Sequence, residues 1–307
     1  MRHLSPEYGA ARPPSRRFNW ISSSEAPYEL RQFQAEMARF YAENPRYYDD
    51  VDFTKDNWRD DEAYRFIGRI LADRSAVLEV GCGRANVLRH YPRLEGSYTG
   101  VDFSSTLMRA NQESFPKAHF IGLRDANSFP FRDREFDCVY STFVLEHCVF
   151  PSAFLDECWR SLKSGGVLLV LCPDMLGRSR MTSQQLGFSI GTGRQKLRSR
   201  QWADALVTAW DTRVRMVLAT WLRRLSARKR PKFYINTSPL CLTQQFQPDF
   251  DAVYLTFRDE IVHYLRDRFR WIDLPREVAR HCDSHGLILL HGVRSGAEEG
   301  SVVAQGA

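Results

Sequence analysis

The sequence predicts an α/β protein built on a doubly wound parallel sheet. Short apolar runs alternate with segments in which apolar residues recur at helical spacing, an order typical of parallel strands joined by crossover helices. The first run breaks directly into Gly81 and Gly83. Because glycine lets the backbone turn sharply and approach a ligand closely, this strand is expected to end in a ligand-binding turn. The runs lie at residues 76–80, 98–102, 118–123, 136–145 and 162–173.

Length and composition favour one α/β domain with additions. At 307 residues and 43% hydrophobic content, the chain can bury one large core. No apolar run follows the start of the chain, and no window reaches the roughly 18 apolar residues of a membrane span, so a cytoplasmic protein is expected. The seven cysteines are odd in number and include no Cys-x-x-Cys pair. This predicts reduced thiols packed in the core.

Positive charge is concentrated in one stretch of the chain. Between Arg194 and Lys232 there are twelve Arg or Lys residues and two acids, Asp204 and Asp211, which gives a local charge of +10. Since the whole chain carries +6, the remaining residues together carry −4. Basicity therefore belongs to one segment. Aromatic residues are not interleaved with basic loops as in RNA-binding surfaces, so nucleic acid is not expected as a partner.

The glycine turn has two interpretations. A dinucleotide-binding fold requires a third glycine where this chain has Asn86, which weakens the case for an NAD-dependent oxidoreductase. In Glu79-x-Gly81-x-Gly83-x-Ala85 an acid stands two positions before the first glycine. This order resembles motif I of the class I S-adenosylmethionine (SAM) methyltransferases. Ala85 occupies the position of the usual third glycine in that family.

Further motifs of the same family follow in order. Asp102 ends the second strand about twenty residues after the glycines, where a carboxylate can accept two hydrogen bonds from a ribose diol. The alternative for Asp102 is a cap for the helix that begins near Ser104. Downstream, Phe-Asp-x-Val at 136–139, Val-Leu-Glu-His at 144–147 and Leu-Lys-Ser-Gly-Gly at 162–166 are similar to patterns of this family.

The resemblance implies a Rossmann-like, doubly wound sheet of seven strands, six parallel and strand seven antiparallel, with SAM as cofactor. It also places an acid-Ala pair after the third strand. Asp125 would accept a hydrogen bond from the adenine amino group, and the backbone N–H of Ala126 would donate to the ring. The residues expected to bind the cofactor are Glu79, Gly81, Cys82, Gly83, Asp102, Phe103, Asp125, Ala126 and Ser141.

Five segments are expected along the chain. The cap contains helices at 28–41 and 61–71. The last segment completes the sheet with a helix at 275–284, strand six at 287–293 and strand seven at 301–305. The segments are a flexible arm (1–24), a helical cap (25–74), the SAM-binding core (75–173), a basic helical insert for substrate or lid (174–274) and the C-terminal completion of the sheet (275–307).

An amphipathic, strongly basic helix is expected within residues 202–230. Apolar residues from Trp202 to Leu225 recur at intervals of three and four, and arginines flank them. Four uses of this helix are open: docking to an anionic membrane surface, binding phosphate groups of a substrate or nucleic acid, covering the active site, and packing on its own domain.

Four residues are candidates for acceptor chemistry. His147 lies near the end of strand four, at the sheet edge where ligands bind, and the ordinary imidazole pKa of about 6.5 suits a general base. A structural or cofactor-orienting role is its alternative. Tyr48 in the cap is a candidate substrate contact, because such helices often form a lid over the cofactor pocket in the family. Asp251 and Tyr254 at the end of the insert are candidates too, with packing as the alternative for each.

No metal site is expected. His281 and His285 stand one helical turn apart with Cys282 beside them, a spacing that would place two ligands on one helix face. A full ligand set is not evident, so a cluster at a helix end without metal is the interpretation preferred.

The function expected from these residues is methyl transfer from SAM to a small-molecule, sugar or lipid-linked acceptor, with O-methylation favoured. One alternative is an RNA methyltransferase that uses the basic insert. Another is a catalytically silent SAM-fold adaptor protein. A silent relative would have no chemical need to keep Glu79, Gly81, Gly83, Asp102 and Asp125 together, which argues against the adaptor.

Overall fold

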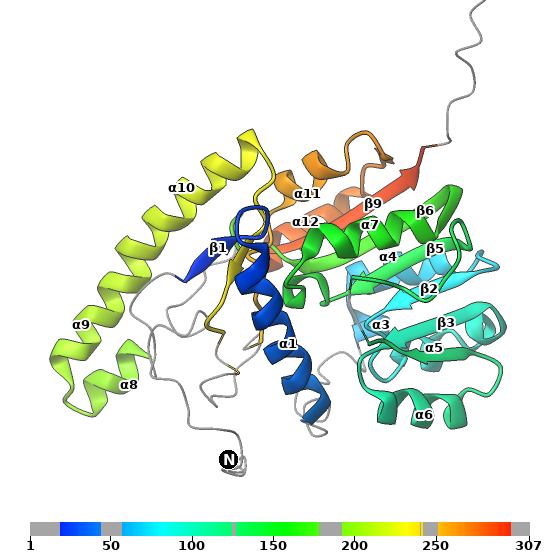
Figure 1. The fold of residues 1–307 in the computed structure, drawn as a ribbon, viewed down its shortest axis with the longest axis horizontal. Coiled ribbons are helices and arrows are strands. Elements are labelled where there is room, and N and C mark those ends of the chain that lie inside the picture. The colour runs from blue at the N-terminus through cyan, green and yellow to red at the C-terminus, as the bar shows by residue number, and fades with distance from the viewer. Residues whose placement is uncertain are drawn as a thin grey trace, which may run out of the picture.

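The computed structural model describes residues 19–43, 57–124, 127–177, 192–239, 241 and 251–295. Its centre is a seven-stranded sheet with strand order β4-β3-β2-β5-β6-β9-β8 (Figure 1). The strands from β2 to β6 pair in parallel, and β9 pairs antiparallel with both β6 and β8. This arrangement confirms the predicted fold class. The strands are β2 (Val77–Val80), β3 (Tyr98–Asp102), β4 (His119–Gly122), β5 (Phe136–Thr142), β6 (Leu162–Pro173), β8 (Phe269–Trp271) and β9 (Leu287–Arg294).

Helices pack on both faces of the sheet. Because alternate residues of a strand point to opposite faces, the strands contribute side chains to two separate cores. In β6, Leu168 and Val170 enter one core, whereas Val167 and Leu169 enter the other. The first core also contains residues of α1 (Pro27–Glu43), α7 (Pro151–Ser161) and α11 (Arg258–Tyr264). The second contains residues of α3 (Asn57–Asp60), α4 (Glu62–Leu71), α5 (Asn86–His90), the 3-10 helix η1 (Pro92–Ser97), α6 (Ser105–Ser114) and α12 (Arg276–His285). All seven cysteines are buried and none forms a disulfide.

The last two strands differ from the expectation. Residues 287–293 were expected as the parallel strand six, but β9 runs antiparallel to β6, with Val167 opposite Val293. The outer strand is β8, which lies inside the segment expected to be insert. The three residues Phe269–Trp271, with an exposed Arg270 between two aromatics, are too short for a strand pattern to be recognised. Residues 301–305, the expected strand seven, lie outside the described residues.

Part of the expected flexible arm is ordered. Strand β1 (Trp20–Ser22) pairs antiparallel with β7 (Tyr234–Asn236), so two segments more than 200 residues apart form a small separate sheet. Trp20 is buried, and the Arg223 guanidinium lies 4.8 Å from its ring centroid. The expectation of a loose arm over 1–24 is therefore wrong for these residues, because a buried tryptophan and backbone pairing stabilise the segment.

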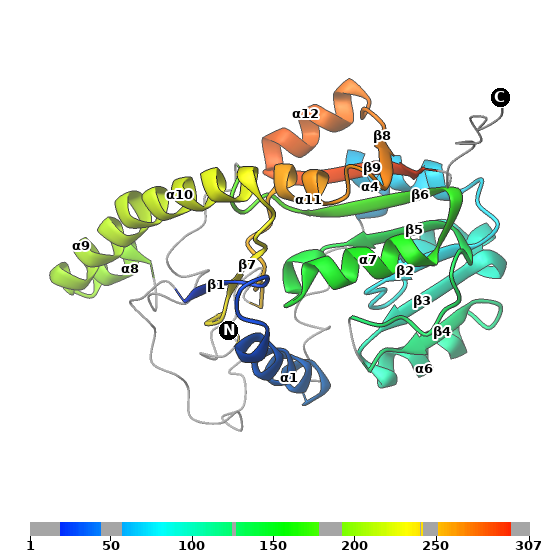
Figure 2. The ribbon, with the colours of Figure 1, turned by 45° about the horizontal axis from the view of Figure 1, so that its top comes forward.

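The basic segment forms a long helical arm that projects away from the sheet (Figures 1 and 2). It consists of α8 (Gly193–Arg198), α9 (Trp202–Trp210), a π-helical turn (Asp211–Arg215) and α10 (Met216–Lys229). The predicted amphipathic helix over 202–230 is confirmed as a helix. Across the described residues, none of the helices has the length and apolar character needed to cross a membrane.

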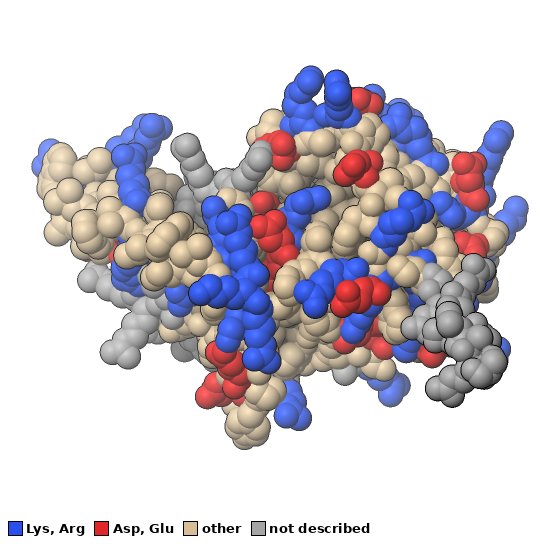
Figure 3. Space-filling model, turned by 90° about the horizontal axis from the view of Figure 1, so that it is seen from above, with Lys and Arg blue, Asp and Glu red and all other residues tan. Residues whose placement is uncertain are grey.

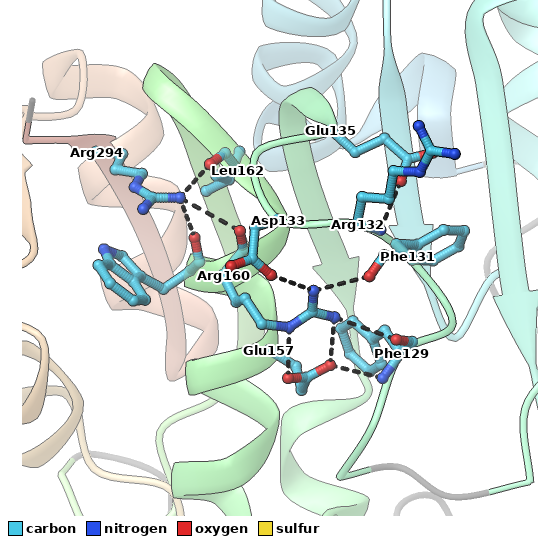
Figure 4. Close-up of polar contacts among 10 residues, drawn as sticks. Phe129, Phe131, Arg132, Asp133, Glu135, Glu157, Arg160, Leu162 and Arg294 are labelled. Carbon is cyan, nitrogen blue, oxygen red and sulfur yellow. Dashed lines mark hydrogen bonds and ion pairs between the residues drawn. The ribbon is translucent and has the colours of Figure 1, made fainter.

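A polar network fixes the loop that follows the expected adenine-binding pair (Figure 4). The Arg160 guanidinium on α7 donates hydrogen bonds to the backbone oxygens of Phe129 and Phe131, at 3.1 and 2.7 Å. It also contacts the carboxylates of Glu157 and Asp133, each at 2.8 Å. The Glu157 carboxylate in turn accepts from the backbone N–H of Phe129 at 2.6 Å. One arginine therefore holds the segment that leads from Asp125 into β5.

Replacing Arg160 by methionine should lower the free energy of unfolding by about 2 kcal/mol, because hydrogen bonds between charged and backbone groups are lost. Urea unfolding followed by circular dichroism measures this change. Arg132→Met is the matched control, since Arg132 is exposed on the same loop. Equal stability of the two variants would show that the network does not hold the loop.

Candidate active site

The glycine turn leaves β2 at the centre of the sheet, as predicted. The backbone N–H groups of Gly81 and Cys82 both donate to the carbonyl of Val101 in β3, at 2.8 and 3.0 Å. Gly81 has φ of +74°, and a Cβ there would lie 2.3 Å from a methyl group of Val144. A side chain at Gly81 would therefore both strain the backbone and collide with the turn after β5.

Gly83 is held from both sides by polar side chains. Its N–H donates to Oδ2 of Asp102 at 3.0 Å, and its carbonyl accepts from Nδ2 of Asn111 at 2.8 Å. Both side chains are buried. A Cβ at Gly83 would meet nothing within 4 Å, so the outer side of the turn is open. Such a pre-shaped turn with an open side fits a ligand that approaches the backbone closely.

Asp102 connects this turn to the next one. Its second oxygen, Oδ1, accepts from the backbone N–H of Ser104 at 3.2 Å. The cap of α6 is Ser104 itself, whose hydroxyl accepts from the N–H of Leu107. Ser104, and not Asp102, is therefore the residue that caps α6. Asp102 instead joins the two loops at the carboxyl edge of β2 and β3.

Asn111 was not identified from the sequence. It lies on α6, and its buried amide reaches back to Gly83, 28 residues earlier. A polar residue on the inner side of an otherwise amphipathic helix was the signal available. That signal alone does not say which backbone group the amide contacts.

Glu79 is a buried carboxyl group below the turn. Tyr98 donates a hydrogen bond from its hydroxyl to the Glu79 carboxylate. Burial raises the pKa of Glu79 to about 7, although the hydrogen bond from Tyr98 opposes the shift. Glu79 is therefore bonded to Tyr98 inside the protein, and its burial favours the neutral carboxyl group.

The other expected cofactor residues differ in position. The Cys82 side chain is buried with its sulfur 3.8 Å from that of Met108, so only its backbone faces the turn. Ser141 is buried in β5, and its hydroxyl has no hydrogen-bond partner among the described residues. Asp125 and Ala126 lie outside the described residues.

An aromatic contact joins the cofactor turn to the acceptor side. Phe103, directly after Asp102, stacks on Tyr41 of α1 with ring centroids 6.4 Å apart and an interplanar angle of 8°. Helix α1 lies beside this edge because Leu30, Phe33 and Met37 pack into the core of the sheet. The cap helix therefore covers the end of the strands where ligands bind in this type of sheet.

The structure brings two of the predicted acceptor-side residues together. The Tyr41 hydroxyl donates to Oδ2 of Asp251 at 2.8 Å, and the same oxygen lies 3.1 Å from Nδ1 of His147. Asp251 is buried, and the His147 side chain is 17% exposed. The buried Asp251 carboxylate therefore lies next to one nitrogen of the His147 imidazole, although the Nδ1 atom makes no hydrogen bond of good geometry among the described residues.

Backbone contacts keep this pair in register. His147 belongs to the 3-10 helix η2 (Leu145–His147), which follows β5. The carbonyl of Glu146 accepts from the N–H groups of Val253 and Tyr254, both at 2.8 Å. The end of the insert is thereby fixed beside His147. The Nε2 atom is 3.8 Å from the nearer Glu146 carboxylate oxygen, beyond hydrogen-bonding distance.

Two candidate substrate contacts have other outcomes. Tyr254 is completely buried, and its hydroxyl donates to Oε2 of Glu260 at 2.8 Å. It therefore supports packing of the insert, which contradicts the expected substrate contact. Tyr48 lies outside the described residues.

The histidine cluster on α12 has a structural partner. Nε2 of His281 lies 2.9 Å from Oδ2 of Asp61, the residue that caps α4. Within the described ranges, no three His, Cys, Asp or Glu side chains are grouped as a metal site. The His281 contact joins two helices on the same face of the sheet.

With this geometry in place, similarity to known proteins identifies the class. Residues 78–170 match the family model described as a methyltransferase domain. The chain is 26% identical over 182 residues to the ubiquinone biosynthesis O-methyltransferase of Rhodopseudomonas palustris strain TIE-1, over 58% of this chain and 68% of the relative. It is 28% identical over 120 residues to a probable S-adenosylmethionine-dependent methyltransferase of Mycolicibacterium smegmatis, over 38% of this chain and 45% of the relative.

The match is confined to the core for most relatives. The chain spans less than half the length of several curated relatives that it matches, between 38% and 45%. The solved structure of 1,6-didemethyltoxoflavin-N1-methyltransferase from Burkholderia thailandensis has a TM-score of 0.48 at 14% identity, over 96% of this chain and 99% of that one. That similarity is too low to add to the assignment.

The matched segment contains the glycine turn, Asp102 and His147. Residues 78–170 form a class I SAM-dependent methyltransferase domain. SAM is the cofactor of this class, and the open glycine turn with its buried acids fits such a ligand.

The pKa of Glu79 makes stability depend on pH. Because the folded-state pKa is about 7 and the ordinary value is 4.5, the contribution of this group to stability is fully present below pH 4.5 and is lost as the pH rises through 7. Glu79→Gln should therefore flatten the fall in stability between pH 5 and 8, and should make the ligand-free protein about 1–3 kcal/mol more stable at pH 8.

Urea unfolding at a series of pH values tests this prediction, with Glu113→Gln on the exposed side of α6 as control. The control should keep the wild-type pH dependence. The same pH dependence in Glu79→Gln would contradict the assigned pKa.

Proposed function

We propose that this protein transfers a methyl group from SAM to a hydroxyl group of its acceptor. The acceptor is a small molecule, a sugar or a lipid-linked molecule. The observation that carries the proposal is the continuous contact from the cofactor turn to the pair of Asp251 and His147, through Phe103 and Tyr41. This contact supports the proposal of a general base close to the edge of the sheet where the cofactor of this class binds.

On the cofactor side, the carboxylate of Asp102 would contact the ribose hydroxyls, and the backbone of the 81–83 turn would lie against the rest of the ligand. Asp125 and Ala126 remain the proposed adenine contacts. The sulfonium of bound SAM supplies an electrophilic methyl group, so little covalent help from the protein is required. The chain's main tasks are to align the acceptor and exclude water, and α1 contributes to both by covering this edge.

On the acceptor side, a hydroxyl must lose a proton as the new bond forms. His147 would accept that proton at Nε2, with the Asp251 carboxylate beside Nδ1, and Tyr41 would keep Asp251 in position. The similarity to ubiquinone biosynthesis O-methyltransferases and to a malonyl-[acyl-carrier protein] O-methyltransferase supports oxygen as the methylated atom.

Asp102→Ala should raise the dissociation constant for SAM at least about tenfold, because the ribose contact and the support for Gly83 are both lost. Isothermal titration measures binding, and urea unfolding of the same sample measures stability. Asp73→Ala, an exposed acid after α4, is the control. Equal affinity in Asp102→Ala would disprove the assignment of this site.

His147→Ala should lower methyl transfer at pH 7 by about 10² or more and leave SAM affinity unchanged, since only proton transfer is removed. Release of S-adenosylhomocysteine is followed with a panel of phenolic, sugar and lipid-linked alcohols. Asp251→Asn should lower the rate in the same direction and shift the pH profile, because the imidazole loses its orienting charge.

His263→Ala on α11 serves as the control for histidine loss. Full activity of His147→Ala on an acceptor that the wild type methylates would contradict the base assignment. Loss of SAM binding in that variant would instead indicate a cofactor-orienting role for His147.

A further inference from the structure

The projecting arm has its faces reversed relative to an ordinary surface helix. The residues that α9, the π-helical turn and α10 bury are mostly small or polar, among them Ala205, Thr208, Asp211 and Ala219. Large apolar side chains on the other side are between 40% and 72% exposed. A soluble helix normally buries the large apolar side chains and exposes the polar ones. The exposed set, called the apolar stripe below, is Trp202, Leu206, Trp210, Val214, Val217, Leu218, Trp221, Leu222 and Leu225.

The apolar stripe is continuous along the arm. Its members recur at intervals of three and four residues, which places them on one side of a helix. Four-residue steps slowly rotate a stripe around an α-helix of 3.6 residues per turn. The π-helical turn at Asp211–Arg215 holds more residues per turn and counteracts that rotation between Trp210 and Val214. The three tryptophans therefore belong to one extended surface.

Arginines on the opposite side attach the arm to the body of the protein. The Arg223 guanidinium lies over the rings of Trp20 and Tyr234, at 4.8 and 5.5 Å from their centroids. Arg224 donates to the backbone carbonyls of Leu176 and Gly177. These contacts fix the rotation of α10. The apolar stripe is thus directed outward by specific interactions.

Exposed cations border the apolar stripe. Six Arg and Lys residues of the arm are exposed and have no acidic partner among the described residues. Figure 3 shows a broad uncharged surface on the projecting arm, with Lys and Arg at its edges and gathered where the arm meets the body. These cations are Arg194, Arg198, Arg200, Arg213, Lys229 and Arg230.

This chemistry matches the interface of an anionic lipid bilayer. Tryptophans are favoured at the level of the lipid headgroups, leucines and valines enter the acyl boundary, and arginines and lysines reach anionic headgroups on either side. An apolar groove on a protein partner would bury the apolar stripe but would provide no anionic groups for the cations along its border. Single-stranded nucleic acid would satisfy the cations but would leave the aliphatic members of the stripe in water.

We propose that the arm formed by residues 193–230 docks on an anionic membrane surface, with the apolar stripe inserted in the plane of the interface. The observation behind this proposal is the outward apolar stripe bordered by unpaired cations. It does not depend on methyl transfer, because neither the glycine turn nor His147 belongs to the arm.

Co-sedimentation of the full chain with lipid vesicles tests the proposal. Binding is expected to vesicles of equal parts phosphatidylcholine and phosphatidylglycerol, with a blue shift of tryptophan fluorescence, and at least about tenfold weaker binding to phosphatidylcholine alone. The double variant Trp210→Ser/Trp221→Ser should bind anionic vesicles at least tenfold more weakly than the wild type. Lys229→Glu/Arg230→Glu should lose several-fold in affinity for anionic vesicles and little for neutral ones.

Tyr28→Ser is the matched control, since Tyr28 is a comparably exposed aromatic residue that belongs to α1 and not to the arm. Circular dichroism and SAM titration show that each variant is folded. Absence of binding to anionic vesicles, or unchanged binding in the tryptophan variant, would overturn the proposal. Tight binding to a short single-stranded RNA without vesicle binding would overturn it in favour of nucleic acid. Dimerisation abolished by the same tryptophan substitutions would identify a second copy as the occupant.

Discussion

The hydrogen bond from Gly83 N–H to the Asp102 carboxylate is the contact on which the site is built. It joins the end of β2 to the end of β3, and Asn111 closes the other side of the same glycine. A turn of two glycines would otherwise sample many conformations, at an entropic cost to any ligand that needs one of them. Because two buried side chains hold it, the turn is shaped before the cofactor arrives. Phe103 directly follows Asp102 in the chain, and its ring contacts Tyr41 of α1.

The helix α1 joins the cofactor turn to the acceptor side. Its apolar residues belong to the core of the sheet, while Tyr41 at its far end contacts both Phe103 and Asp251. The segment that carries Asp251 is attached to η2, which follows β5, through backbone hydrogen bonds to Glu146. The glycine turn, α1 and the pair of Asp251 and His147 are thus parts of one packed unit, whereas the basic arm is attached from outside.

The sequence predicted the parts that local patterns determine and not those that depend on contacts between distant residues. The central strands, the glycine turn and Asp102 follow from short patterns of apolar, glycine and acidic residues. The pairing of Tyr41 with Asp251 joins residues 210 positions apart. Arg160 and Asn111 donate hydrogen bonds to backbone carbonyls that no sequence pattern identifies as their partners. Strand β8 is too short to be recognised. The helical arm was predicted, but the side on which its tryptophans lie depends on arginine contacts formed only in the folded protein.

The most direct test of the account is parallel calorimetric titration of the purified protein with SAM, S-adenosylhomocysteine and NADH. If the Glu79–Gly83 turn and Asp102 form the cofactor site of a methyltransferase, both adenosyl ligands should bind with dissociation constants on the order of micromolar, and NADH should give no heat of binding. Binding of NADH, or no heat of binding with either adenosyl ligand, would contradict the assignment of the cofactor site and the activity proposed for it.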